Sequence, residues 1–388
     1  MLLHALMTFP RGLPRGLPRP SRTKAARPAG LPMLWLATAL LSSLPVVAAQ
    51  EPLAAPPSLG ARDVSQATTR AVDYLLTQQR ADGAISDSAH ETAMTSLAIL
   101  AMASVGHQPG EPTPAGRAMT QALDFVLAED RQEDSGYFGR ADRSRMYGHG
   151  ITTLMLTEMM GMGGDQQQDA RIVERLLPAV DLILAAQAHP KPPRYAGGWR
   201  YTPTAKDADL SVSIWQLLAL RSAKNDDVQV PTAAIDQALD YLRRSSASPL
   251  DPSGRPADPQ TGFTYEPQER NATYSMTAAG VLAMQICGEG DAPVVQAALR
   301  WLAEHPPRWK ESWFFYGTYY YAQAMQGSEE TQRRQARSAV TEILLAEQQA
   351  DGSWEGRGQE ASHGAVYSTT LALLSLSVKH HYLPIYQR

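Results

Sequence analysis

Apolar residues recur along most of the chain at steps of three and four positions, the spacing of one face of an α-helix. In six segments charged residues separate these positions, as in residues 238–242 (ALDYL). This pattern predicts amphipathic helices, each with one buried and one exposed face. The six segments are residues 69–79, 117–130, 171–187, 232–244, 294–304 and 338–349.

A second apolar segment follows each amphipathic one and differs in kind. Its middle carries almost no charge and is apolar or small on every side, which predicts a helix buried all round. These segments are residues 92–105, 150–162, 210–223, 275–287, 314–326 and 367–379. A glycine-centred turn joins the two helices in five of the six pairs, and residues 306–309 (PPRW) join them in the fifth pair.

Six pairs of this kind predict an all-α fold, an α/α toroid (α6/α6 barrel) of six helix hairpins. The buried helices form the inner ring and the amphipathic helices the outer one. An open solenoid is the alternative, but the last pair is as apolar as the others and has no polar cap, which favours closure. All inner helices would run in one direction, so that their N-termini meet at one mouth of the ring and favour an anion there.

The N-terminus predicts a targeting segment. A basic stretch, an apolar stretch and a small-residue site follow one another in residues 1–49, the order of an export signal. We therefore expect a protein exported to the periplasm or the cell exterior, with a Pro/Ala linker over residues 50–63 and one toroid domain over 64–388. An uncleaved signal that anchors the chain is the alternative, and membrane contact is expected only through this segment.

The charge of the chain limits the classes of possible partner, and its cysteine content limits how the fold can be stabilised. Beyond residue 49 the chain has 29 Lys and Arg against 39 Asp and Glu, and an acidic body argues against nucleic acid as a partner. A single cysteine excludes an internal disulfide framework, so that the fold depends on apolar burial. The oligomeric state has no signature in the sequence.

The repeat resembles a known family. Residues 348–354 (QQADGSW), and more weakly 78–83 (QQRADG), are similar to the repeat of squalene–hopene cyclases and protein prenyltransferase β subunits, the prenyltransferase/squalene oxidase repeat family. The resemblance covers residues 64–386. It implies the toroid fold and an apolar or isoprenoid-like small molecule as partner, with an isomerase-like activity of the class II terpenoid cyclase type if the protein is an enzyme.

The stretch 207–211 (DADLS) looks like the acid motif of the class II cyclases. The resemblance makes Asp209 a buried proton donor with Asp207 beside it, although Leu210 replaces the third acid of the motif. The alternative is that Asp209 caps an inner helix. His149, flanked by two glycines, is the candidate partner at the same mouth, and its alternative is a hydrogen-bonded core histidine.

Aromatic residues near the same inner-helix starts are the candidates for substrate binding. This set consists of Tyr147, Trp199, Tyr201, Tyr316, Tyr319 and Tyr367, together with Ser211. Residues 209–216 also resemble the zinc segment of prenyltransferase β subunits, but Ser211 stands at the thiol position. We therefore expect no metal and no other cofactor.

Three functions remain open at this point. The first is a terpene-cyclase-like or prenyl-lipid-handling protein that uses Asp209. The second is a non-catalytic toroid that binds a lipid, a glycan or a peptide at its mouth. The third is a polysaccharide-degrading enzyme, which needs a pair of carboxylates and could use Asp209 with Glu91.

Overall fold

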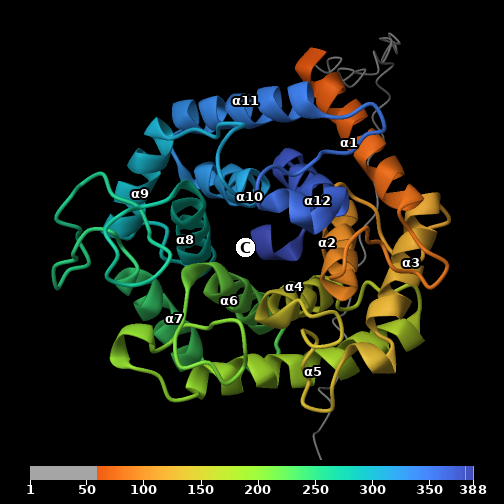
Figure 1. Ribbon diagram of the computed structural model, residues 1–388, viewed down its shortest axis with the longest axis horizontal. Coiled ribbons are helices and arrows are strands. Elements are labelled where there is room, and N and C mark those ends of the chain that lie inside the picture. The colour runs from red at the N-terminus through yellow and green to blue at the C-terminus, as the bar shows by residue number, and fades with distance from the viewer. Residues whose placement is uncertain (1–58, 381, 388) are drawn as a thin grey trace, which may run out of the picture. The chain divides into compact units, whose positions relative to one another are not determined.

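The computed structural model describes residues 59–380 and 382–387 (Figure 1). These residues form α-helices, short 3-10 helices and isolated bridges, without a β-strand. The outer helices are α1 (Leu59–Thr77), α3 (Pro114–Val126), α5 (Gln166–Ala188), α7 (Thr232–Arg244), α9 (Pro293–Glu304) and α11 (Glu330–Glu347). The inner helices are α2 (Glu91–Ser104), α4 (Arg145–Glu158), α6 (Leu210–Asn225), α8 (Tyr274–Ile286), α10 (Phe314–Ala324) and α12 (Gly364–Leu376).

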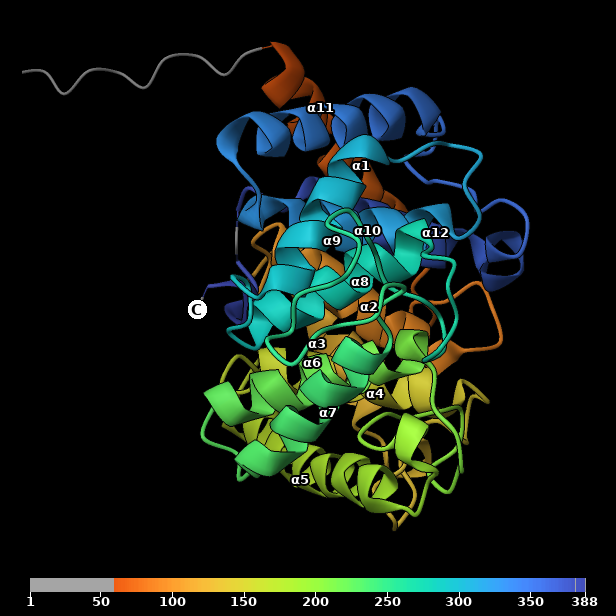
Figure 2. The same cartoon turned by 90° about the vertical axis from the view of Figure 1, so that its left-hand side faces the viewer.

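The helices form two concentric rings, which confirms the predicted toroid of six hairpins (Figures 1 and 2). Each inner helix packs against the inner helix before and after it, and α12 packs against α2. Every residue of α2 from Thr92 to Ser104 is buried, whereas α7 buries one face only. The two hydrophobic patterns of the sequence therefore separate the helices into the two rings, because only a helix that is apolar all round is stable inside the ring.

The first and last hairpins close the ring. Gln348 Nε2 donates a hydrogen bond to the carbonyl oxygen of Ala67 in α1, with 2.9 Å between the two atoms. Asp87 Oδ2, which precedes α2, accepts hydrogen bonds from the backbone N–H groups of Ala365 and Val366 at 2.6 and 3.1 Å. The carboxylate of one hairpin thus caps the inner helix of its neighbour, and an open solenoid is excluded.

Glutamine and glycine join neighbouring hairpins of the outer ring. In four hairpins a glutamine Nε2 donates one hydrogen bond to the carbonyl oxygen of the turn glycine and another to a backbone carbonyl of the next outer helix. The pairs are Gln79 with Gly83, Gln132 with Gly136, Gln187 with Gly197, and Gln348 with Gly352. Each of these glycines has a φ of +83° to +93°, and a Cβ there would lie 2.1–2.3 Å from a backbone oxygen of the next outer helix. The repeated glutamine and glycine are therefore structural.

Several helix boundaries differ from the predictions, and two of them bear on the predicted linker and on the candidate site. Helix α1 begins at Leu59, within residues 50–63 that the sequence assigned to a linker, because Val64 and Ala67 already lie against the core. Helix α4 begins at Arg145 rather than at residue 150, because Gly148 and Gly150 continue the helix. A Cβ at Gly150 would lie 2.4 Å from Gln216 Nε2 of α6, so this glycine allows two inner helices to pack closely and does not form an opening for a ligand.

The predicted export signal over residues 1–49 lies outside the described residues, and the predicted export stays a prediction. None of the described helices has the length and apolar character that crossing a bilayer requires.

The C-terminal segment η5 (Pro384–Tyr386) covers the end of the ring at which α4 and α6 end. Ile385 donates its backbone N–H to Glu158 Oε2 at 3.1 Å, and Glu158 is the last residue of α4. The hydroxyl groups of Tyr319 and Tyr386 lie 2.5 Å apart. The opposite end, where the inner helices begin, is called the mouth below.

Candidate functional site

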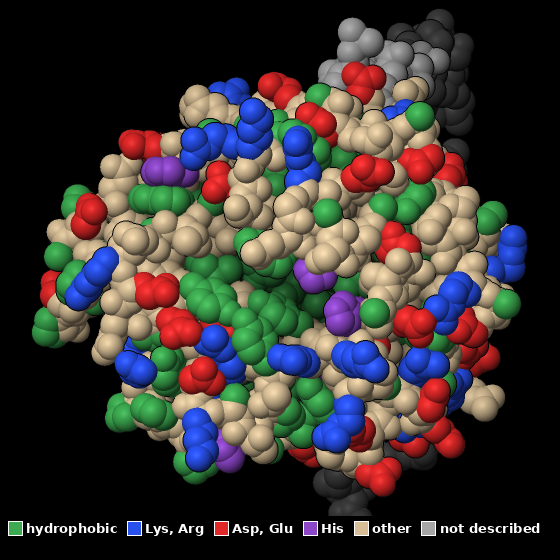
Figure 3. Space-filling view, viewed as in Figure 1, with side chains coloured by type: hydrophobic (Ala, Val, Ile, Leu, Met, Phe, Trp, Pro, Cys, Tyr) green, Lys and Arg blue, Asp and Glu red, His purple; other side chains and the backbone are tan. Residues whose placement is uncertain are grey.

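A cavity of about 870 Å³ lies at the mouth, and residues at the starts of all six inner helices line it. Figure 3 shows it as a hollow with a largely hydrophobic floor and with histidine side chains along its edge. The aromatic lining residues are Tyr147, Tyr201, Trp215, Tyr265, Tyr274, Trp313, Tyr316 and Tyr367. The predicted convergence of the inner-helix N-termini thus creates a space of the size of a ligand pocket.

Polar side chains lie among these rings. His90 and His363 face each other across 6.3 Å between ring centroids, and His363 also lies 5.1 Å from the Tyr367 ring centroid. Burial lowers the pKa of His363, and the nearby His90 lowers it further. Besides these two histidines, the ionisable side chains of the lining with a formal charge are Arg143, Arg145 and Glu311.

The backbone is strained at this site. Five described residues other than glycine have a φ in the left-handed region, and three of them line the cavity: Arg143 at 61°, Arg145 at 59° and Trp313 at 57°. Such a conformation costs on the order of 1 kcal/mol for a side chain of this size and is concentrated at functional sites. Three of the five described non-glycine residues with a positive φ thus lie at the mouth, which makes this end of the ring the candidate functional end.

Asp209 is the N-cap residue of α6. Its Oδ1 accepts hydrogen bonds from the backbone N–H of Val212 at 2.9 Å and from Ser211 Oγ at 2.5 Å. Its Oδ2 lies 3.3 Å from Arg200 Nε and has no hydrogen bond in the part of the chain that the structure describes. Burial raises the pKa of the carboxyl group, and the bonds from Ser211 and Val212 oppose this shift.

The side chain of Asp209 is fully buried and lies behind the cavity wall, where Ser211 separates it from the lumen. The hydroxyl of Tyr147 contacts Ser211 Oγ, so that a hydrogen-bonded chain leads from the cavity to Asp209. Asp207 is half exposed, lies 3.7 Å from Arg200 Nε and is not part of the lining. The geometry therefore favours the interpretation of Asp209 as a helix cap, and it places Asp207 outside the cavity.

His149 holds a position that a serine or threonine holds in four of the other five hairpins. There a large residue beside the turn donates its backbone N–H to a hydroxyl of the inner helix: Ile85 to Thr95, Trp199 to Ser213, Phe263 to Thr277 and Trp354 to Thr369. In the second hairpin Phe138 N–H donates to His149 Nδ1 at 3.4 Å, and Nε2 donates to the carbonyl oxygen of Ala179 at 3.1 Å. The ring is completely buried, and burial lowers its pKa to about 3. The geometry places His149 in the core as a neutral structural group.

Of the residues predicted to bind substrate, Tyr147, Tyr201, Ser211, Tyr316 and Tyr367 line the cavity. The other two do not. Trp199 is buried and donates its indole N–H to the carbonyl oxygen of Ile183 at 2.8 Å. Tyr319 stacks on the Trp215 ring with 6.0 Å between centroids and points to the closed end.

Sequence reasoning missed several lining residues, notably Arg143, Arg145, Trp313, Tyr265 and Tyr274. They lie in the loops before the inner helices or at the first residue of one. An alignment of the six hairpins on their inner-helix starts would have placed them at the mouth.

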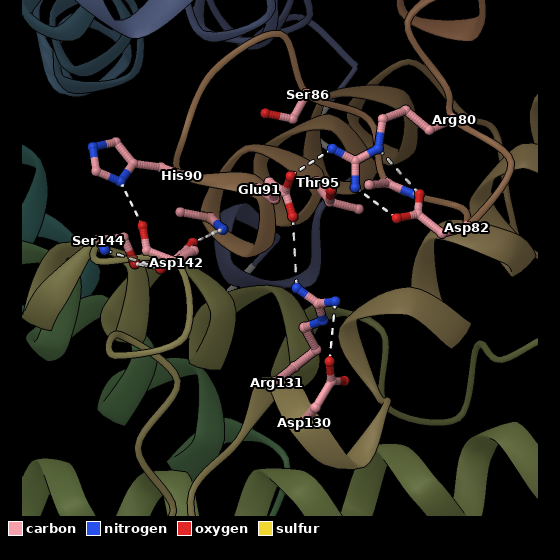
Figure 4. A network of polar contacts seen from close by, with 12 residues as sticks. Arg80, Asp82, Ser86, His90, Glu91, Thr95, Asp130, Arg131, Asp142 and Ser144 are labelled. Atoms are coloured by element: carbon pink, nitrogen blue, oxygen red, sulfur yellow. Dashed lines mark hydrogen bonds and ion pairs between the residues drawn. The ribbon is translucent and has the colours of Figure 1, made fainter.

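Glu91, the proposed carboxylate partner of Asp209, belongs to a separate polar network (Figure 4). Its carboxylate lies 2.5 Å from Arg80 Nη1 and 3.6 Å from Arg131 Nη1, and Glu91 is not part of the cavity lining. In the same view His90 Nδ1 contacts the carbonyl oxygen of Asp142 at 2.9 Å, and Asp142 Oδ2 caps α2 by accepting the N–H of Ala93 at 3.0 Å. The structure thus gives Glu91 an ion-pairing role outside the cavity.

No family model matches the chain, and no curated protein matches its sequence. Among solved structures it is similar to an inactive variant of the GH76A alpha-1,6-mannanase of Salegentibacter sp. HEL1_6 in complex with alpha-1,6-mannotetrose (TM-score 0.55, 9% identity, 81% of this chain and 98% of that one). It is also similar to a glycosidase in complex with glucose (TM-score 0.52, 13% identity, 85% and 100% covered) and to an alpha-amylase from Clostridium perfringens (TM-score 0.51, 11% identity, 81% and 97% covered).

At these identities the similarity establishes the α/α toroid fold. It also corrects the sequence-based assignment. The matching toroids are glycosidases, so the assignment to the prenyltransferase/squalene oxidase repeat family is wrong, and the terpene-cyclase hypothesis and the isoprenoid-like partner lose their support.

Proposed function

We propose that this protein binds a carbohydrate chain in the cavity at the mouth of the toroid. The observation that carries the proposal is the ring of eight aromatic side chains around a cavity of about 870 Å³. One face of a pyranose ring presents C–H groups and stacks on an aromatic face, while its hydroxyl groups remain at the edge for hydrogen bonding.

Polar groups for those hydroxyls are available beside the rings. Ser144, Thr273, Ser275 and Gln359 lie in the lining and can donate or accept hydrogen bonds. Similar toroids hold alpha-1,6-mannotetrose in one solved structure and glucose in another, which supports the choice of a sugar over a lipid or a peptide.

Hydrolysis is a second candidate, which the names of the similar glycosidases favour. Glycoside hydrolysis generally uses two carboxyl groups about 5–10 Å apart on either side of the scissile bond. Glu311 is the one carboxylate in the lining among the described residues, and Asp209 lies behind Ser211. Because the second carboxyl group is not presented to the cavity, we propose binding as the function and hydrolysis as an outcome for the test.

Calorimetric titration with manno-, malto- and xylo-oligosaccharides tests binding. The variant Trp313→Asn removes a lining ring, and asparagine tolerates the left-handed backbone at this position. Loss of one stacking contact of about 1.4 kcal/mol predicts an affinity about tenfold lower. The matched control is Trp301→Asn, since Trp301 lies on outer helix α9, stacks on His305 and does not line the cavity.

Binding that depends on Trp313 and not on Trp301 supports the proposal. Absence of binding to neutral and acidic oligosaccharides alike at millimolar concentration, by a protein that unfolds cooperatively, contradicts it. Chromatography of the same mixtures decides on hydrolysis: shorter products made by the wild type and lost in Glu311→Gln establish turnover, and intact saccharides exclude it for these substrates.

A further inference from the structure

The charged groups of the cavity are predominantly positive. Arg143 and Arg145 precede and begin α4, and Glu311 is the single acidic residue in the described lining. Glu311 Oε2 itself lies 3.7 Å from Arg308 Nε, so its charge is partly balanced from outside the lining. This positive mouth lies on a chain whose residues beyond position 49 carry ten more acids than bases.

The guanidinium groups of Arg143 and Arg145 have no ion pair and no hydrogen bond with any residue that the structure describes. Arg140 in the same loop differs, because it forms an ion pair with Glu133. Asp142 directly precedes Arg143 in sequence, but its carboxylate is buried and accepts hydrogen bonds from the N–H groups of Ala93 and Ser144. The two positive charges at the mouth are therefore available to a ligand.

The backbone holds these two residues in a costly conformation. Both have a φ near 60°, which glycine or asparagine would adopt with less strain. A loop whose only role was to connect two elements would gain stability from glycine there. The arrangement instead places two long cationic side chains at the entrance to an aromatic cavity.

We infer that the ligand of this cavity is an acidic carbohydrate, a glycan with carboxylate groups such as a uronate oligosaccharide, bound through Arg143 and Arg145. This inference rests on the proposed function. A guanidinium group offers a planar fork of N–H donors that matches a carboxylate in two parallel hydrogen bonds. A neutral sugar would remove water from both arginines without supplying an opposite charge, and its binding would be weaker for this reason.

The test compares oligogalacturonate with neutral malto-oligosaccharide of equal length by calorimetric titration, with sulfated oligosaccharide as a third ligand. The variant Arg143→Gln/Arg145→Gln removes both charges, and Arg140→Gln is the matched control from the same loop. We expect the wild type to bind the uronate at least tenfold more tightly than the neutral sugar. The double variant loses this preference, and Arg140→Gln keeps it.

A rise of the dissociation constant for the uronate between 50 and 500 mM NaCl, absent in the double variant, further supports the inference. Equal affinity for neutral and acidic sugars, or a preference that survives in the double variant, overturns it and leaves the proposed function in place. A preference for the sulfated ligand over the uronate overturns the assignment of a carboxylate as the recognised group, because sulfate would then be the anion that the two arginines bind. If none of the three binds, the inference and the proposed function fail together.

Discussion

The buried imidazole of His149 makes a quantitative prediction about acid stability. In the folded protein its pKa is lowered to about 3 by burial, against an ordinary value of 6.5 in the unfolded chain. Below pH 6.5 the unfolded chain therefore binds a proton that the folded protein does not bind. Stability from this group is fully present above pH 6.5 and decreases as the pH falls towards 3, because the unfolded state is favoured by about 1.4 kcal/mol for each pH unit in this window.

Between pH 7 and pH 4.5 this difference amounts to about 2.5 kcal/mol of the free energy of unfolding. Other groups titrate in the same range, so the wild type must be compared with His149→Gln. Glutamine can accept a hydrogen bond and donate one, but it does not titrate. Urea denaturation of both proteins at pH 7, 6, 5 and 4.5 gives the two stability curves.

We expect the variant to be less stable than the wild type at pH 7, because glutamine packs less well beside Phe138. The difference between the two free energies of unfolding should become smaller by about 2.5 kcal/mol at pH 4.5. Carbohydrate binding at pH 7 should be unchanged, since His149 does not line the cavity. Two stability curves that remain parallel within about 0.5 kcal/mol would refute a neutral buried histidine. Loss of carbohydrate binding by a fully folded variant would show that His149 does take part in the binding site.

Two further predictions concern the contact between neighbouring hairpins at Gly197 and the N-cap of α6 at Asp209. In Gly197→Ala, a φ of +83° and a Cβ 2.1 Å from the carbonyl oxygen of Gln237 should lower the free energy of unfolding by about 3 kcal/mol or more, measured by urea denaturation. Gly254→Ala is the control with a similar φ and open space around the Cβ, and an equal loss there would show that clash with the neighbouring hairpin is irrelevant. Asp209→Ala should cost about 3 kcal/mol, because α6 loses its cap and Arg200 loses a buried partner. Asp209→Ser keeps a capping oxygen and should recover about 1 kcal/mol of that loss in the same assay, whereas equal stability of the two variants would contradict the capping role.

Local pattern was sufficient to predict the fold. Helical period and the contrast between one-sided and all-round apolar segments depend only on neighbours a few positions apart, and they correctly predicted two rings of six helices. The common direction of the inner helices predicted that residues at their starts would meet at one mouth. Ser211 and Tyr316 do line the cavity there, whereas His149, for which the same argument was made, lies in the core.

The hydrophobic pattern was not sufficient to assign the family or the function. The repeated glutamine and glycine looked like the mark of one enzyme family, but in four of the six hairpins they serve the packing of one hairpin against the next. A motif that is imposed by packing cannot distinguish toroids with different activities.

The sequence by itself determined the helices, their two kinds and the aromatic character of the mouth. Only the tertiary structure decided which polar groups reach the cavity, because that depends on rotation about single residues in the loops and on contacts between hairpins. His149 and Asp209 stand near inner-helix starts in sequence, yet one lies in the core and the other behind Ser211. Arg143 and Arg145 reach the lumen through left-handed backbone angles, which no hydrophobic pattern encodes.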